Sequence, residues 1–293
     1  MSEKVLVAGA TGYVGRYLVQ ALHGAGYQVR ALVRSQQVAE APGAYGAPAL
    51  SGLVDEWVVR DITADGQAEG LCEGVDRVVS ALGVTRQKAD PWDVDFLGNL
   101  RLLEDAERHG AQSFCYVNVM NVWSGQSMIL RSKAAFTTAL TRSRLKHQVI
   151  NPSGYFSDLS TFLSMARTGV VMLPPQPDVQ LSPIHGADVA AAFLEKMLGA
   201  SGAWYIGGPE VLTYRDVTRL AFEALGKKER TVTMPLSLTR GTLRLASHLD
   251  SRSRNLAQFF ADGLTQNSVG KLYGQHALSD YFKALVQAGV EKK

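Results

Sequence analysis

The 293-residue chain opens with short apolar runs that alternate with amphipathic stretches. Lys4–Ala8 reads as a buried strand, and Gly12–Leu22 has apolar residues at helical spacing. Further strands are predicted over Gln28–Val33, Glu56–Val59, Arg77–Ser80, Phe114–Val119 and Gln148–Asn151, and further helices over Trp92–Arg108 and Met128–Arg142. Strands that alternate with helices indicate a parallel sheet covered on both faces. We therefore expect an α/β fold, a Rossmann-like, doubly wound parallel sheet.

The pattern changes after Asn151, where prolines break the chain. The elements expected there are a helix over Gly186–Leu198, a strand over Ala203–Ile206, and a helix from Thr213 to Leu225 with Asp216 at the capping-box position. From Leu236 onward only helical stretches are expected. We predict an NADP-binding domain in residues 1–151, with core strands extending later in the chain. A smaller, mainly helical substrate region in residues 152–293 would be interleaved with it.

A glycine-rich turn, GATGYVG, joins the first strand to the first helix. Gly9 permits the tight turn, Gly12 lets backbone N–H groups approach a pyrophosphate, and Gly15 lets the helix pack on the strand. The N-terminus of that helix also favours phosphate binding. The pattern predicts a dinucleotide site, with contacts expected from Gly9, Thr11, Gly12, Tyr13, Val14 and Gly15.

The end of the second predicted strand discriminates between the two nicotinamide cofactors. NAD sites usually carry an acidic residue about 20 residues after the glycines, where it bonds the ribose hydroxyls. Here the strand runs into Arg34, and no acid occurs before Glu40. Arg34 is suited to pair with a 2′-phosphate, so the predicted cofactor is NADP.

Composition narrows the class of protein. Apolar residues make up 46% of the chain and the net charge is only +3, which is typical of a folded domain. No apolar run is long enough to span a membrane, and the N-terminus lacks the layout of a signal peptide. We expect a cytoplasmic protein, a monomer or homodimer, that binds a small-molecule substrate and no nucleic acid. Cys72 and Cys115 are expected to be buried thiols.

No metal site is expected. The six histidines are scattered, with no H-E-x-x-H or C-x-x-C spacing. Asp90, Asp93 and Asp95 fit the charge preference of a helix N-terminus better than a metal site. His185 precedes a predicted helix near the expected cleft, and a structural role is favoured for it.

Several segments, in order from Lys4 to about Pro235, resemble the short-chain dehydrogenase/reductase superfamily. The resemblance is to its atypical branch of NmrA-like, isoflavone-reductase-like and divinyl-reductase-like proteins. The segments are the TGxxG turn, Arg60-Asp61-Ile62, Ser80-Ala81-Leu82-Gly83, Asn151-Pro152-Ser153-Gly154-Tyr155-Phe156, Ile184–Ala190 and Tyr205–Glu210. The resemblance implies further cofactor contacts from Asp61, Ile62, Ser80, Ala81, Leu82, Asn118, Lys133, Asn151, Pro152 and Ser153.

The chain departs from that superfamily at the usual catalytic residues. Ordinary members use a Tyr-x-x-x-Lys pair with a nearby serine, but no tyrosine here has a lysine four residues later. Lys133 stands at the position of the lysine, Ile129 replaces the tyrosine, and the serine region around Asn118 has no serine. Lys133 is therefore the one candidate catalytic residue, either holding the ribose or acting as general acid/base.

Three functions fit these residues. The first is an NADPH-dependent reductase of a small substrate with a polarised C=C or C=O bond. The second is a non-catalytic NADP(H)-binding redox sensor or assembly factor, and the third is an enzyme like sugar-nucleotide epimerases. A reductase requires an enclosed pocket at the nicotinamide, expected to be lined by Asn118, Ile129, Tyr155 and Phe156.

Overall fold

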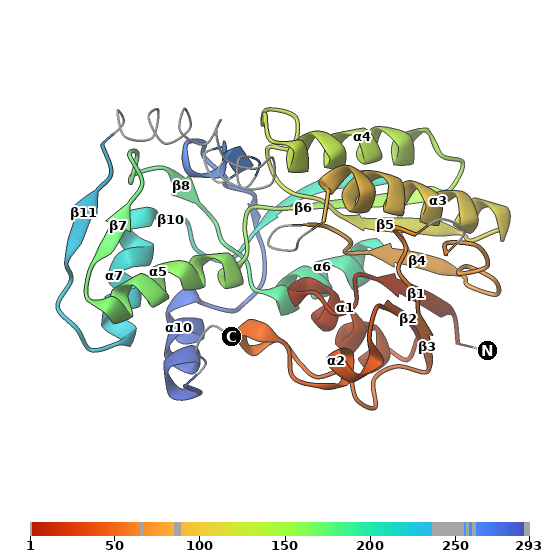
Figure 1. Ribbon diagram of the computed structural model, residues 1–293, viewed down its shortest axis with the longest axis horizontal. Coiled ribbons are helices and arrows are strands. Elements are labelled where there is room, and N and C mark those ends of the chain that lie inside the picture. The colour runs from red at the N-terminus through yellow and green to blue at the C-terminus, as the bar shows by residue number, and fades with distance from the viewer. Residues whose placement is uncertain are drawn as a thin grey trace.

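The computed structural model describes residues 2–64, 67–84, 89–235, 255, 258–259 and 262–289. Its centre is an eight-stranded sheet of order β12-β9-β6-β5-β4-β1-β2-β3 in which every neighbouring pair is parallel (Figure 1). The strands are β1 (Lys4–Ala8), β2 (Gln28–Val33), β3 (Glu56–Val59), β4 (Arg77–Ser80), β5 (Ser113–Val117), β6 (Lys146–Pro152), β9 (Gly202–Gly207) and β12 (Lys271–Leu272). The chain runs outward from β1 to β2 and β3, then returns to β4 on the other side of β1. In such sheets, ligands bind at the carboxyl ends of the strands that flank this reversal, here β1 and β4.

Helices cover both faces of the sheet, as the sequence predicts. One face carries α1 (Tyr13–Gly24) and α6 (Gly186–Lys196), with side chains such as Leu18, Ile150 and Phe193 buried between them and the strands. The other face carries α3 (Asn99–Arg108) and α4 (Met128–Arg142), over a core that includes Phe114 and Phe136. The short helix α2 (Gln36–Glu40) follows β2.

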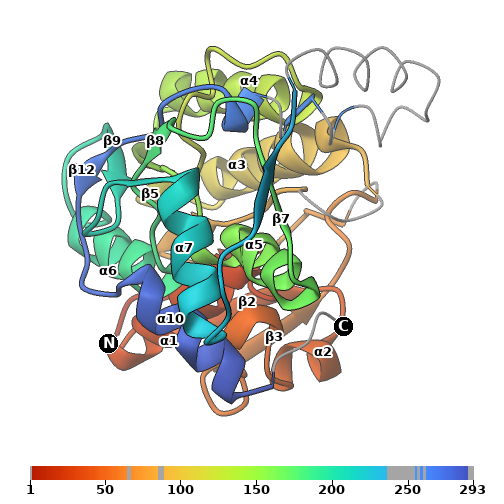
Figure 2. The same ribbon diagram turned by 90° about the vertical axis from the view of Figure 1, so that its left-hand side faces the viewer.

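A second unit packs beside the sheet (Figure 2). In the described residues it comprises three helices and two small sheets, which share a separate apolar core. Its elements are α5 (Phe156–Thr168), β7 (Val171–Leu173), β8 (Gln180–Leu181), β10 (Leu212–Thr213), α7 (Tyr214–Ala224), β11 (Thr231–Thr233) and α10 (Leu278–Gln287). The fold class predicted from the sequence is confirmed.

The second half of the chain contains one helix that the sequence did not predict, and one expectation for it is corrected. Helix α5 escaped notice because its serines and threonines weaken the apolar pattern. The expectation of helices alone after Leu236 is wrong, because Lys271–Leu272 extends the sheet beside β9. A two-residue strand has no detectable periodicity, and only the neighbouring strand β9 defines it. Residues 236–254 and Phe260 lie outside the described residues.

The predicted helix Trp92–Arg108 is also corrected. Its first part, Trp92–Gly98 (η2), is a π-helix, and the α-helix begins at Asn99. The side-chain amide of Asn99 donates to the carbonyls of Val94 and Asp95, at 3.3 and 3.0 Å. These bonds satisfy carbonyls of the wider turn. π-Turns often occur at functional sites, and this one carries Asp95.

Smaller predictions hold. Thr213 and Asp216 form the expected capping box at α7, and Cys72 and Cys115 are free, buried thiols. None of the helices in the described ranges is both long and apolar enough to cross a bilayer.

Candidate functional site

The glycine turn forms a close-packed cradle at the end of β1. A side chain at Gly9, where φ is +75°, would lie 2.6 Å from the carbonyl oxygen of Ala81. One at Gly15 would overlap the carbonyl of Gly9, so both positions exclude a Cβ. Gly12 is the N-cap of α1, and its own Cβ position contacts only the Gly9 carbonyl. The cradle therefore leaves open backbone at Gly12, as binding of a pyrophosphate requires.

The segment after β4 lies directly against this turn. Ala81 and Leu82 flank the position of Gly9, and the amide of Ala81 donates to the carbonyl of Ala8 at 2.9 Å. The hydroxyl of Ser80 is turned into the protein, where it donates to Asn99 Oδ1 at 2.5 Å. Any contact of Ser80 with a cofactor would thus come from its backbone.

The ends of β2 and β3 bring two arginines to the same edge. Val33 pairs with Val59, so Arg34 and Arg60 directly follow the last paired positions of neighbouring strands. Both side chains are exposed. Only Arg34 was singled out from the sequence as a phosphate contact. The register of β2 against β3 shows that Arg60 lies at the same edge.

Asp61 lies next to these arginines. The hydroxyl and amide of Thr63 donate to its carboxylate at 2.7 and 3.0 Å. These bonds, with a contribution from the charge of Arg34, hold the pKa of Asp61 below its ordinary value. Ile62 is buried, so the pair presents one ionised group and one core residue.

Lys133 is held by two partners that the sequence did not connect with it. Its Nζ lies 2.9 Å from Oδ1 of Asp95 in η2, and it donates to the hydroxyl of Tyr116 in β5 at 3.3 Å. The side chain of Lys133 is 12% exposed and that of Asp95 is fully buried. A Cβ at Gly83 would lie 3.0 Å from Nζ, so the segment after β4 passes close to the ammonium group.

These contacts fix the charge of Lys133. Burial alone would lower the pKa of Lys133, but the carboxylate of Asp95 and the hydroxyl of Tyr116 outweigh it and raise that pKa. Burial raises the pKa of Tyr116 to about 12, so this hydroxyl stays protonated. An ammonium group has three donors, and two are accounted for. Among the described residues, the third has no partner.

Two asparagines form a directional pair at the ends of β5 and β6. Nδ2 of Asn151 donates to the carbonyl of Trp204 at 3.4 Å, which turns its Oδ1 toward Asn118. Nδ2 of Asn118 donates to that oxygen at 2.8 Å. Oδ1 of Asn118 is left buried and without a hydrogen bond within the described residues. The pair thus ends in an acceptor, where the superfamily serine would offer a donor.

The segment after β6 divides between the site and the core. The hydroxyl of Ser153 donates to the carbonyl of Ser182, and Pro152 and Phe156 are buried. Tyr155 is only half buried, and its ring lies 6.1 Å from that of Tyr13 at the glycine turn. No hydrogen bond to the Tyr155 hydroxyl occurs among the described residues. Burial raises the pKa of Tyr155, and the charge of Lys133 opposes this rise.

His185 has a structural position, as favoured from the sequence. Its Nδ1 accepts from the amide of Ala187 and so caps α6. Its ring stacks on that of His276, whose Nδ1 is paired with Asp188 at 2.8 Å. Burial, followed by the neighbouring His276, lowers the pKa of His185 to about 4, so it is neutral near pH 7.

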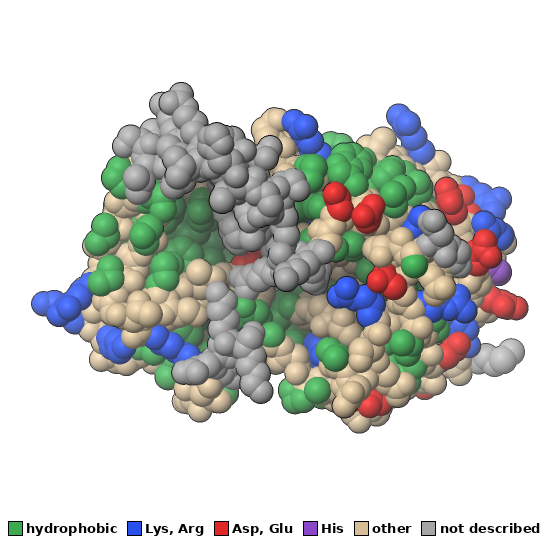
Figure 3. Space-filling view, in the orientation of Figure 1, with side chains coloured by type: hydrophobic (Ala, Val, Ile, Leu, Met, Phe, Trp, Pro, Cys, Tyr) green, Lys and Arg blue, Asp and Glu red, His purple; other side chains and the backbone are tan. Residues whose placement is uncertain are grey.

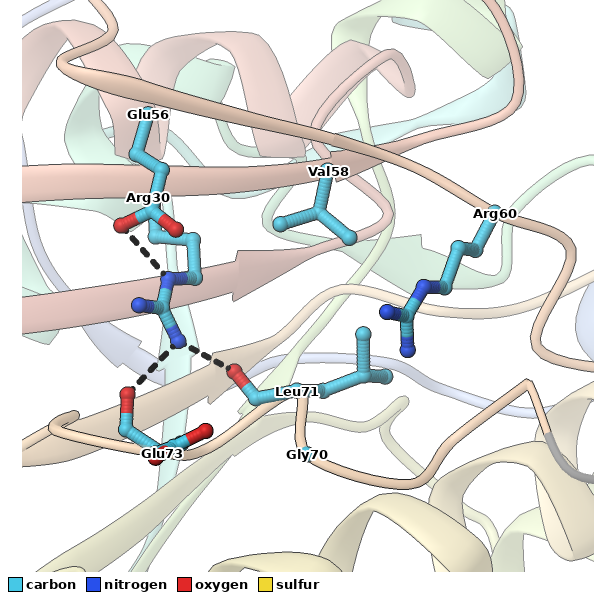
Figure 4. Close-up of a pocket in the computed structure, with 7 residues that line it drawn as sticks. All are labelled: Arg30, Glu56, Val58, Arg60, Gly70, Leu71 and Glu73. Atoms are coloured by element: carbon cyan, nitrogen blue, oxygen red, sulfur yellow. Dashed lines mark hydrogen bonds and ion pairs between the residues drawn. The ribbon is translucent and has the colours of Figure 1, made fainter.

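A surface hollow of about 290 Å³ lies at the β2–β3 edge, and Arg30, Glu56 and Arg60 are among the residues that line it (Figure 4). The buried guanidinium of Arg30 closes one end, bonded to Glu56 and to the carbonyls of Leu71 and Glu73. On the face seen in Figure 3, basic and acidic side chains are interspersed over the sheet-bearing half. Exposed apolar side chains, including Met172 and Val232, belong to the small β7–β11 sheet.

Residues 9–198, from the glycine turn to the end of α6, match the family model described as NAD(P)H-binding. The chain belongs to this family. The resemblance to the atypical short-chain dehydrogenases/reductases is thereby confirmed, and a nicotinamide dinucleotide is the cofactor class.

The proteins of similar sequence include both a reductase and an assembly factor. The chain is 24% identical to the chloroplastic divinyl chlorophyllide a 8-vinyl-reductase of Zea mays, over 98% of this chain and 80% of that protein. It is 27% identical to the photosystem II assembly factor Ycf39 of Cyanophora paradoxa, over 53% of this chain and 46% of that protein. The fold is similar to the NADPH-dependent quinone oxidoreductase QOR2 of Escherichia coli, solved with NADPH. In that case the TM-score is 0.71 and the identity 16%, over 96% of this chain and 99% of the other.

Sequence reasoning missed the partners of Lys133. Tyr116 was not singled out from the sequence, and Asp95 was assigned to a helix N-terminus. The detectable signal was an acidic residue between the apolar Val94 and Phe96. Within the described residues, no cluster of potential metal ligands is present.

We expect the Lys133–Asp95 pair to be a major stabilising contact. Asp95→Asn or Lys133→Met should each lower the free energy of unfolding by about 3–5 kcal/mol, because each leaves one buried charge uncompensated. The double variant should cost at least about 1 kcal/mol less than the sum, because the two groups interact directly. Urea unfolding followed by circular dichroism measures all three.

The exposed Lys283–Asp280 pair, at 3.2 Å, is a matched control. Its Lys283→Met variant should change stability by less than about 1 kcal/mol. Single variants of the buried pair that cost no more than this control would show that the contact is not maintained in solution.

Proposed function

We propose that the protein is an NADPH-dependent reductase whose substrate is a small organic molecule with a polarised C=C bond. The observation that carries this proposal is the ammonium group of Lys133, held charged beside the segment after β4 with one donor to spare. The cradle at Gly9, Gly12 and Gly15 fits a bound dinucleotide, since added side chains at Gly9 and Gly15 would collide with backbone. The similar protein from Zea mays is a divinyl chlorophyllide a 8-vinyl-reductase, and a vinyl group is a C=C bond.

The reduced nicotinamide, when bound, supplies a hydride to one carbon of the substrate double bond. Lys133 would hold the nicotinamide ribose through its third N–H and keep a positive charge near the reacting atoms. Asp95 and Tyr116 hold the ammonium group of Lys133 in place, so of its two candidate roles the positioning role is better supported. Residues 81–83, Asn118 and Asn151 would line the cofactor along the strand ends.

A C=C reduction also needs a proton for the second carbon. Tyr155 has a hydroxyl without a partner in the described part of the chain, half-buried between Tyr13 of the glycine turn and the end of β6. We assign it the proton: its O–H bond breaks, a C–H bond forms on the substrate, and solvent reprotonates the phenolate. The nearby charge of Lys133 stabilises that phenolate.

The acceptor-only end of the asparagine pair favours C=C over C=O reduction. A carbonyl substrate requires a donor for its oxygen, which the superfamily serine and tyrosine supply. Here Ile129 and the Asn118 carbonyl oxygen stand in those places. The same missing tyrosine weakens the epimerase-like alternative.

A non-catalytic role is the second candidate, since the chain is similar to an assembly factor over about half its length. Such a protein needs bound cofactor but no proton donor. Turnover separates the two candidates.

NADP(H) should bind at least tenfold tighter than NAD(H), about 1.4 kcal/mol, because Arg34 and Arg60 can both contact a 2′-phosphate and no acidic residue stands at the end of β2. Arg34→Ala and Arg60→Ala should each reduce this preference, whereas Arg142→Ala, an exposed residue at the end of α4, should not. Isothermal titration with both cofactors measures the ratio. Equal affinities in the unmodified protein would remove the role given to the arginines.

Activity is tested by following NADPH absorbance with a panel of enones, quinones and aldehydes. We expect oxidation above the protein-free rate, fastest with enones and abolished in Gly12→Val, whose side chain would block the backbone at the cradle. Tyr155→Phe should lower kcat at least tenfold and leave the Kd of NADPH unchanged. Tyr205→Phe, which alters a tyrosine exposed on β9, should have no effect. Tight NADPH binding with no turnover across the panel would favour the non-catalytic role.

A further inference from the structure

A buried arginine in α1 joins the phosphate-binding turn to the segment that follows Arg34. The guanidinium of Arg16 lies within hydrogen-bonding distance of five backbone carbonyl oxygens, and the side chain is only 3% exposed. Its Nε donates to Thr11 of the glycine turn at 3.1 Å. The other four acceptors, at 2.7–3.0 Å, are the carbonyls of Val38, Ala39, Ala41 and Pro48.

These four carbonyls belong to the chain just beyond the end of β2. Arg34 follows the strand, Ser35 caps the five-residue helix α2, and a stretch that includes a short 3-10 helix at Ala44–Gly46 then runs to Leu50. Such a stretch loses much conformational entropy when it is ordered. The planar guanidinium of Arg16 has several donors, and its hydrogen bonds hold this stretch in one conformation.

The site is built around this one side chain. A Cβ at Gly43 would lie 2.6 Å from Cδ and Nε of Arg16, so the stretch can close over the guanidinium only with glycine there. No carboxylate forms an ion pair with Arg16 in the described part of the chain. A buried cation without a counterion, bonded to the Thr11 carbonyl, adds positive potential behind the turn expected to carry the pyrophosphate.

We infer that Arg16 is a positioning residue for cofactor specificity, which couples the phosphate turn to the loop carrying the 2′-phosphate site. The inference rests on the proposed NADP(H) cofactor and concerns neither substrate nor turnover. Arg16 itself is buried, so it would not touch the cofactor. It places Arg34, at one end of the ordered stretch, relative to Thr11 and Gly12 at the phosphates.

The coupling predicts an unequal loss of affinity. Without Arg16, part of the binding free energy is used to order the stretch after Arg34. Because NADPH is expected to make more contacts there than NADH, it should lose more affinity. Arg16→Met should raise the Kd of NADPH at least thirtyfold and that of NADH less than fivefold. Arg16→Lys keeps the charge but has only three donors, and should show a smaller loss in the same ratio. Gly43→Ala, which displaces the guanidinium, should act in the same direction.

Val19→Ala is the matched control, since Val19 lies in the same helix and is fully buried, but its side chain can make no hydrogen bond. It should lower Tm without changing the ratio of the two Kd values. Titration calorimetry with both cofactors is combined with hydrogen exchange of residues 34–50, which should become faster in Arg16→Met and not in Val19→Ala.

Three results would overturn the inference. Arg16 variants that lower Tm like Val19→Ala and leave both Kd values unchanged would make Arg16 a contact for folding alone. An equal rise of both Kd values would confine its effect to the glycine turn. A natural protein that does not prefer NADPH would refute it together with the cofactor assignment. A protein that prefers NADPH but reduces no substrate would refute only the proposed activity.

Discussion

The close approach of backbone to backbone at the glycine turn is the constraint on which the rest of the site depends. Because Gly9 and Gly15 have no side chains, α1 starts directly against β1 and the segment after β4. That contact sets the height of α1 over the sheet, and with it the position of Arg16. This geometry leaves the backbone open at Gly12. It also determines where Arg16 holds the segment after Arg34 and where Gly83 passes beside Lys133.

The site combines a fixed charge with few free hydroxyls. The hydroxyls of Ser80 and Ser153 donate to groups within the fold, and that of Tyr116 accepts from Lys133. Asn118 donates to Asn151, and its own side-chain oxygen is left as an acceptor. Tyr155 alone among these residues keeps a hydroxyl without a partner in the described structure. This distribution suits a reaction that needs a positioned cofactor and one proton, rather than a polarised carbonyl oxygen.

The sequence predicted what depends on local patterns and failed where tertiary contacts decide. Strands such as Lys4–Ala8 and helices such as Met128–Arg142 have clear periodicity, and the glycine turn has a spacing with a specific physical purpose. The π-helix at Trp92–Gly98 depends on the side chain of Asn99, and β12 exists only because β9 offers an edge. Lys133 could be located by resemblance, but Asp95 lies 38 positions away in the sequence and only the packing of η2 on α4 brings it within 2.9 Å. The contact of each assigned residue with the cofactor stays a prediction.

The central claim is that NADPH lies along the ends of β1, β4 and β5 with its nicotinamide ribose against Lys133. A crystal structure of the NADPH complex tests it most directly. We expect Nζ of Lys133 within hydrogen-bond distance of a ribose hydroxyl, about 2.7–3.2 Å, while its contact with Asp95 is kept. The nicotinamide ring should lie near Tyr155. A complex in which Lys133 contacts only Asp95 and Tyr116, or points to bulk solvent with the cofactor elsewhere, would contradict the account.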